Sequence, residues 1–159
     1  MFSKLENNNR GVALVEVLIG ISLITIVGVF IGVTITQYVA TRNIILSDTN
    51  KAYLAEEGYE IIRFLRDENW SNISGLSNNT YYYLQVSTST LSIGGTPELI
   101  NSKYHRSFKV QSIYRNASGN IVDSSVAGSV LDTDARNLFV YVADENSTTT
   151  FEAILTNLP

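Results

Sequence analysis

A chain of 159 residues has room for one domain and an appendage, and its formal net charge of −4 provides no overall basic field for nucleic acid. It contains no cysteine and one histidine, His105, which excludes a disulfide framework and a thiolate zinc site and nearly removes the usual catalytic bases. The composition therefore argues against an enzyme, and we expect neither a cofactor nor a bound metal.

The N-terminal region combines a short basic leader with a long apolar run. The leader, residues 1–11 (MFSKLENNNRG), carries Lys4 and Arg10. Residues 12–35 are apolar apart from Glu16 and a few small hydroxyl residues. A membrane-spanning helix needs about 20 such residues, whereas the apolar core of a signal peptide has about 7–15. The run predicts one transmembrane helix, with the N-terminus in the cytoplasm and the rest of the chain outside.

A helical pattern continues through residues 36–69, but with two different faces. One apolar stripe recurs at spacings of three and four residues and comprises Ala52, Ala55, Tyr59, Ile62 and Leu65. Charged residues follow the same spacing on another face. Because no proline interrupts residues 12–67, we expect one continuous helix whose first part is apolar all round and whose second part is amphipathic.

Residues 70–159 have the period-two pattern and turn residues of a small antiparallel β domain. The expected strands cover residues 81–87, 104–114, 121–122, 138–142 and 149–155. Residues 70–79 and 124–134 read as loops, and 116–120 (NASGN) as a tight turn.

Within the long expected strand, alternation places Phe108 and Val110 on one face, together with Ser112 and Tyr114. That apolar face needs a cover, and the amphipathic part of the helix is the segment available for it. We therefore expect an α+β fold in which a long N-terminal helix packs on a small antiparallel sheet.

One motif opens the apolar helix: residues 10–16 read R-G-V-A-L-V-E. This segment resembles the start of type IV pilins and their pseudopilin relatives, in which a basic leader ends in Gly and an apolar helix follows with Glu at its fifth mature position. Gly11 matches the last leader residue, Val12 the new N-terminus and Glu16 the glutamate. Val12 departs from the Phe that is usual at this place. The resemblance is also visible, less specifically, in residues 51–70 and in the C-terminal segment.

The resemblance implies a pilin-like fold and a defined maturation. A prepilin peptidase would cleave between Gly11 and Val12, and the new amine of Val12 would be methylated. Glu16 would pair with the N-terminal amine of a neighbouring pilin subunit. A membrane assembly platform and a cytoplasmic ATPase would then build the filament. The protein would thus be a single-pass protein of the inner, cytoplasmic membrane before it enters an extracellular filament.

Glu16 is also notable without the resemblance. A carboxylate in hydrocarbon costs a few kcal/mol and is retained for a partner or a function. Cleavage after Gly11 would place an α-amino group one turn away, and an anion near a helix N-terminus is favourable. The alternative is an incidental Glu near the interface of a generic signal anchor.

Other signals are weaker. Gly28 and Gly32 form a G-x-x-x-G pattern, which suits close helix packing or ordinary membrane-helix flexibility. Asp123, Asp132 and Asp134 lack a full calcium loop and read as solvated turns. We expect His105 to lie at the surface. In the cluster Tyr81–Tyr83, we expect Tyr81 and Tyr83 to pack. The scattered Lys and Arg residues leave nucleic acid as an open but unsupported partner.

The sequence therefore favours a structural subunit, a minor pilin, of a type IV pilus-like filament. A pseudopilin of a type II secretion system shares every one of these features. A monomeric, signal-anchored binding domain is the third reading, and it requires no cleavage at Gly11 and no role for Glu16.

Overall fold

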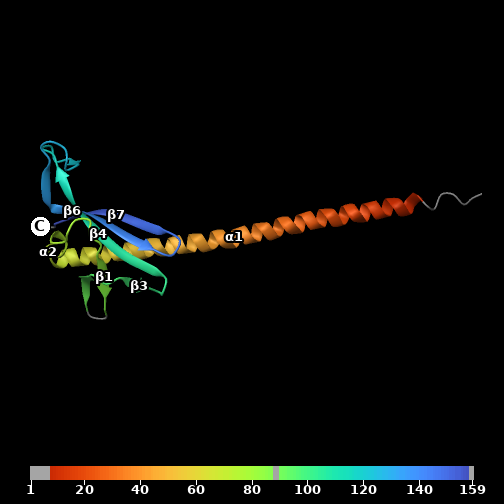
Figure 1. The fold of residues 1–159 in the computed structure, drawn as a ribbon, viewed down its shortest axis with the longest axis horizontal. Coiled ribbons are helices and arrows are strands. Elements are labelled where there is room, and N and C mark those ends of the chain that lie inside the picture. The colour runs from red at the N-terminus through yellow and green to blue at the C-terminus, as the bar shows by residue number, and fades with distance from the viewer. Residues whose placement is uncertain (1–7, 88–89, 158–159) are drawn as a thin grey trace, which may run out of the picture. The chain divides into compact units, whose positions relative to one another are not determined.

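The computed structural model describes residues 8–87 and 90–157 and divides the chain into two compact units. The first unit ends at Leu46 and the second begins at Ser47, so the division falls inside helix α1, Asn8–Glu68 (Figure 1). The expected helix covered residues 12–67, and the structure adds the end of the leader, Asn8–Gly11, to it. The α+β class with one long N-terminal helix and antiparallel sheets is confirmed.

The first unit is a helix without a buried face. From Val12 to Leu46 every residue except Gly20 is exposed. Its hydroxyl side chains donate hydrogen bonds back to helix carbonyls, as Ser22 Oγ does to Leu18 O at 2.7 Å, and Thr25, Thr34 and Thr36 do likewise. These polar groups are satisfied within the helix, so they leave its outer surface apolar.

The second unit contains a short helix and seven strands after α1. Their bounds are α2 Ser71–Ser74, β1 Tyr83–Val86, β2 Leu91–Gly94, β3 Glu98–Ile100, β4 Tyr104–Arg115, β5 Ile121–Val122, β6 Val130–Ala143 and β7 Thr148–Thr156. Strands β1 and β2 form a two-stranded antiparallel sheet. A second antiparallel sheet has the order β3-β4-β6-β7, with β5 paired to the end of β4. The predicted single sheet is therefore two sheets.

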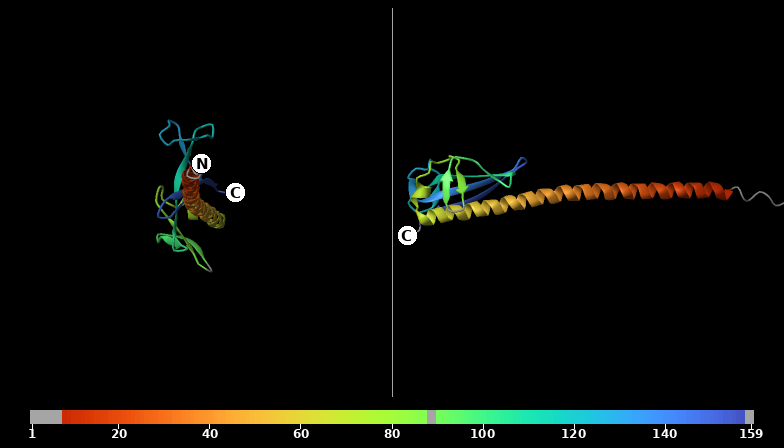
Figure 2. Two further views of the ribbon diagram at one scale, coloured as in Figure 1. Left: turned by 90° about the vertical axis from the view of Figure 1, so that its right-hand side faces the viewer. Right: turned by 90° about the horizontal axis from the view of Figure 1, so that it is seen from below.

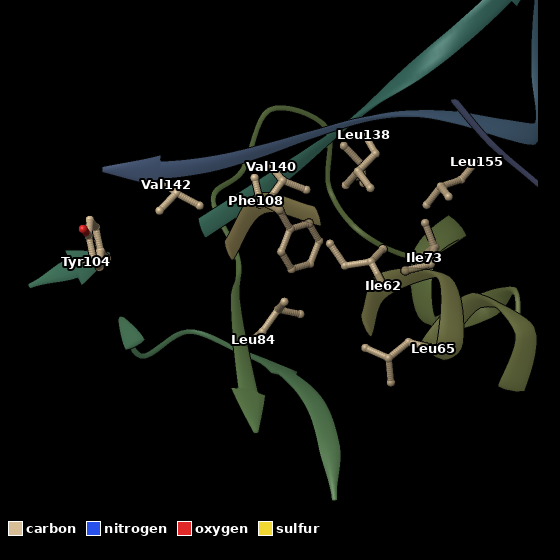
Figure 3. Close-up of a cluster of buried hydrophobic side chains, with 12 residues drawn as sticks. Ile62, Leu65, Ile73, Leu84, Tyr104, Phe108, Leu138, Val140, Val142 and Leu155 are labelled. Atoms are coloured by element: carbon tan, nitrogen blue, oxygen red, sulfur yellow. The ribbon is translucent and has the colours of Figure 1, made fainter. Parts of the chain in front are cut away.

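The core of the second unit lies between the end of α1 and the inner face of the larger sheet (Figure 2, right). Ile62 and Leu65 of α1 are buried with Phe108, Val140 and other apolar side chains (Figure 3). The buried positions of the helix are Lys51, Ala55, Gly58, Ile62 and Leu65, a regular alternation of four and three residues. The prediction that Ala52 lies on this stripe is wrong, because Ala52 is exposed and Lys51 takes the buried position.

An irregularity in β6 changes the pattern at the end of β4. Ser112 pairs with Arg136, but the next residue, Ile113, pairs with Asp132. Ser112 is half-buried, but the next residue, Ile113, is buried. The alternation predicted to continue from Ser112 to Tyr114 is therefore interrupted at this irregularity. The same pairing extends β6 back to Val130, so the loop expected over residues 124–134 is too long.

Short elements inside polar segments were also missed. The loop expected over 70–79 contains α2, because Asn69 Oδ1 accepts hydrogen bonds from the backbone N–H and the hydroxyl of Ser71, and Ile73 is buried in the core. Strands β2 and β3 carry no clear alternation and were not predicted. The turn at 116–120 is confirmed: Gly119 has φ +80°, a conformation that glycine adopts freely.

Candidate functional site

The candidate site is the first part of the exposed helix, where the leader gives way to the apolar run. Gly11 and Val12 both lie within α1, and Glu16 follows Val12 by one helical turn. Val12, Val15, Glu16 and Ile19 lie together on one exposed face of this helix. The helix thus places the carboxylate of Glu16 on the same face as the residue that would become the N-terminus.

Glu16 has no counter-charge in the part of the chain that the structure describes: no side chain of residues 8–87 or 90–157 makes an ion pair or hydrogen bond with it. Its neighbours on this face are aliphatic. The carboxylate is exposed in the chain alone, and it would bind a cation or an amine strongly only where lipid or another helix covers this face and excludes water.

The two glycines of the G-x-x-x-G pattern lie further along the same exposed helix. A Cβ atom built on Gly28 or Gly32 would meet no atom within 4 Å. Nothing in the chain's own packing therefore requires glycine at either position. At spacing four they share one face, where they form a shallow notch that permits the close approach of another helix.

The exposed apolar surface continues beyond the expected membrane run, and sequence reasoning missed this. Tyr38, Val39 and the consecutive residues Ile44, Ile45 and Leu46 are exposed. Arg42, the only charged residue besides Glu16 between Val12 and Leu46, lies among them. The run NIIL at residues 43–46 could have indicated this longer apolar surface. The predicted membrane helix ended at Ile35 because residues 12–35 are already long enough to cross a bilayer.

A polar cluster fastens the second part of α1 to the turn between β6 and β7. Ser47 Oγ donates to Asp144 Oδ2 at 2.6 Å, and Lys51 pairs with Asp48 and Asp144 and donates to Ser147. The hydrogen bond from Ser47, with those from the backbone of Asn146 and Ser147, holds the pKa of Asp144 well below its usual range. Burial alone would lower the pKa of Lys51, but its hydrogen bond to Asp48 and the charge of Asp144 raise it.

The weaker candidates do not form a site. His105 is exposed on β4. Asp132 accepts a hydrogen bond from Arg115 at 2.6 Å, and Asp123 caps its own turn through Ser125. Among residues 8–87 and 90–157, no three metal-ligating side chains gather. Four of the scattered arginines, Arg63, Arg66, Arg106 and Arg115, pair with acidic residues, so they form no basic stripe.

The tyrosine cluster differs from its prediction. Tyr81 is exposed, at 54%, and Tyr82 is the residue that packs towards the core, with its ring centroid 5.8 Å from that of Phe108. The cause is the backbone pairing of Tyr82 with Phe108, which places both side chains on the inner face of the sheet.

Comparisons of the chain with protein-family models, with curated proteins and with solved structures find no significant match. A functional proposal for this chain therefore rests on its own sequence and structure. Helix α1 is long and apolar enough to cross a membrane: its most apolar window has a mean hydropathy of 2.7, and none of that window is buried within the chain. A signal sequence near an N-terminus meets the same criterion of length and composition.

Proposed function

We propose that the chain is a type IV pilin-like filament subunit, made as a prepilin, cleaved between Gly11 and Val12 and assembled through α1. The observation that carries the proposal is the position of Glu16. It is a carboxylate without a partner in the described chain, one turn after Gly11–Val12, on a helix whose apolar surface is exposed from Val12 to Leu46. Minor pilin is the role that the motif and the small β domain favour.

The extent of the apolar surface supports assembly beyond membrane anchoring. From Val12 to Leu46 the helix spans about 50 Å at 1.5 Å per residue, whereas the hydrocarbon core of a bilayer is about 30 Å thick. A bilayer alone leaves part of this surface, around Ile44–Leu46, in contact with water or headgroups. Neighbouring helices in a filament would bury all of it, which is favourable in proportion to the area removed from water.

The mechanism is physical. Before assembly, lipid covers the apolar helix and holds the subunit in the cytoplasmic membrane. During assembly the same surface exchanges lipid for neighbouring helices, with close approach at Gly28 and Gly32. Cleavage after Gly11 supplies a cationic amine at Val12. Glu16 then pairs with the amine of an adjacent subunit, which removes the unfavourable free energy of a lone carboxylate and fixes the register of the two helices.

The test is incorporation of Glu16→Val into filaments in the native cell, measured by immunoblotting sheared filaments and the membrane fraction. We expect wild-type amounts in the membrane and a loss of about tenfold or more from filaments, because the substitution removes a charged pair but keeps the helix apolar.

Ser22→Val is the matched control, since Ser22 is polar but already bonded to Leu18 O. It should leave both fractions unchanged. Normal incorporation of Glu16→Val would contradict the pairing of Glu16, and its loss from the membrane would show that the substitution acts on insertion.

A further inference from the structure

The outer face of the larger sheet, opposite α1, carries a compact group of aromatic residues around one lysine. The register pairs Lys109 of β4 with Phe139 of β6, and Ser107 with Tyr141. Their chain neighbours Phe108, Val110, Leu138 and Val140 are buried on the inner face. Lys109, Phe139 and Tyr141 therefore face away from the core, and Tyr81, from the segment before β1, lies against them. We call these four residues the aromatic face.

The geometry of the aromatic face fixes the lysine among the rings. Lys109 Nζ lies 5.4 Å from the ring centroids of both Phe139 and Tyr141 and 5.9 Å from that of Tyr81. The rings also contact one another, with Tyr81 and Tyr141 centroids 5.6 Å apart and Phe139 and Tyr141 centroids 6.5 Å apart. Cation–π attraction holds the ammonium in place, so less side-chain entropy is lost when a ligand binds it.

The charge of Lys109 is not neutralised in the described part of the chain. Among residues 8–87 and 90–157 no carboxylate forms an ion pair with it. Glu152 is the acidic residue that pairs with Phe139 across β6 and β7, and its carboxylate accepts a hydrogen bond from Asn137 Nδ2 at 2.7 Å. Lys109 is therefore a fixed cation beside partly exposed aromatic rings, on a chain of net negative charge.

We propose that the aromatic face binds an acidic carbohydrate, a sugar chain whose residues carry ring carboxylates. A sugar ring has apolar C–H faces that stack on aromatic side chains, and its hydroxyl groups bond to polar residues at the edge. Gln111, Asn137 and Thr150 lie on the same face of the sheet. The amide groups of Gln111 and Asn137 already donate to Asn79 and Glu152. In the part of the chain that the structure describes, the exposed hydroxyl of Thr150 is therefore the group that is free for a ligand. The ligand carboxylate meets the ammonium of Lys109, which forms a charge-assisted hydrogen bond.

The distribution of charge decides against the nearest alternative. Single-stranded nucleic acid also stacks on aromatic rings, but its proteins line the backbone with a track of cations. Here the four residues of the aromatic face contain one cation, which can meet a single ring carboxylate but does not form the track of cations that a polyphosphate backbone requires. The site lies entirely within the second unit and is independent of the proposed filament assembly.

The experiment measures binding of the full chain, in detergent micelles, to immobilised polygalacturonate, alginate, hyaluronan and a sialylated oligosaccharide. Dextran serves as the neutral probe and a single-stranded thymidine oligonucleotide as the phosphate probe. We expect binding to at least one carboxylated sugar and none to dextran.

Lys109→Gln should weaken that binding about tenfold or more, since it removes the charge but keeps a side chain that hydrogen-bonds. Tyr81→Ala, at an exposed position, should weaken it severalfold. Lys103→Gln removes a lysine that lies over Tyr104, outside the aromatic face, and should change nothing. An unchanged unfolding midpoint shows that each variant is folded.

Three results would overturn the proposal: no binding to any of the four carboxylated sugars, equal binding by Lys109→Gln and wild type, or tighter binding of the oligonucleotide than of every sugar. The last result would assign the face to nucleic acid.

Discussion

The two parts of α1 are one helix in two environments. Residues 47–68 bury a stripe that repeats every three or four positions, and the rest of their surface is mainly polar, with Tyr53 and Phe64 as exposed apolar exceptions. Residues 12–46 have no such division, because apolar side chains surround the helix and its hydroxyl groups bond back to it. One sheet can cover a stripe but not a whole circumference. The second part therefore finds its partner within the chain, and the first part needs a partner from outside.

The same type of substitution in both parts of α1 tests the difference between them most strongly. Ile62→Ala, at a position 0% exposed, should lower the free energy of unfolding of the second unit by about 2–5 kcal/mol through lost burial and a residual cavity. Ile24→Ala, at a position 74% exposed, should leave it unchanged. Denaturation of the full chain in detergent, followed by fluorescence of Trp70, measures both variants. Equal effects would contradict the division of the helix.

The polar cluster at the start of the second part gives the next largest effect. Lys51→Met should destabilise the second unit by about 1–3 kcal/mol, since it leaves Asp144 without the cation beside it in a poorly solvated place. Arg63→Met breaks an exposed pair with Glu60 and should cost about 0.5 kcal/mol or less. The same denaturation experiment compares them. A Lys51→Met variant as stable as Arg63→Met would show that the cluster does not hold α1 to the β6–β7 turn.

Glycine substitutions should have smaller effects on stability, and these effects should again differ between the two parts of α1. A Cβ at Gly58 would lie 3.0 Å from Arg106 Cδ and 3.2 Å from Val140 Cγ1, whereas Gly28 and Gly32 have open space. We expect Gly58→Ala to destabilise the second unit by about 1 kcal/mol, because crowding outweighs the gain in helix propensity. Gly28→Ala and Gly32→Ala should not change its unfolding but should reduce filament incorporation. Full incorporation of both would rule out close packing at the notch.

The polar cluster should also make the stability of the second unit depend on pH. The pKa of Asp144 is lower in the folded chain than in the unfolded chain, so the unfolded chain binds its proton first as pH falls. Its contribution to stability is complete at neutral pH and declines from about pH 4 downward. Asp144→Asn should therefore be less stable than wild type at pH 7, and the difference should shrink in acid. Glu145→Gln, at an exposed neighbouring position, is the control, and a difference independent of pH would contradict this role.

The sequence predicts those features whose pattern is long and local. The α1 helix, the strands around Phe108 and Val140, and the NASGN turn follow from periodicity and turn residues, and the structure confirms them. The features that were missed depend on distant partners. The irregularity that buries Ile113 arises from the register of β6, and β2 and β3 exist only through pairing with β1 and β4. No local pattern contains that information.

The functional residues also divide into those that a local motif predicts and those that distant segments bring together. Gly11, Val12 and Glu16 were predicted from one contiguous motif, and the helix places Val12 and Glu16 on one exposed face. The aromatic face was not predicted, because Tyr81, Lys109 and Phe139 come from three separate segments. Alternation predicted that Tyr81 packs, and its ring does contact that of Tyr141, but it does so on the outer face of the sheet, because the pairing of Tyr82 with Phe108 turns Tyr82 inward.

The most direct test of the account is the N-terminal sequence and intact mass of the mature chain, produced with and without a prepilin peptidase. We expect a start at Val12 with a methyl-sized mass increment only when the peptidase is present, and an uncleaved precursor for Gly11→Lys under both conditions. A chain that begins at Met1 in both cases would contradict it and identify α1 as a plain membrane anchor.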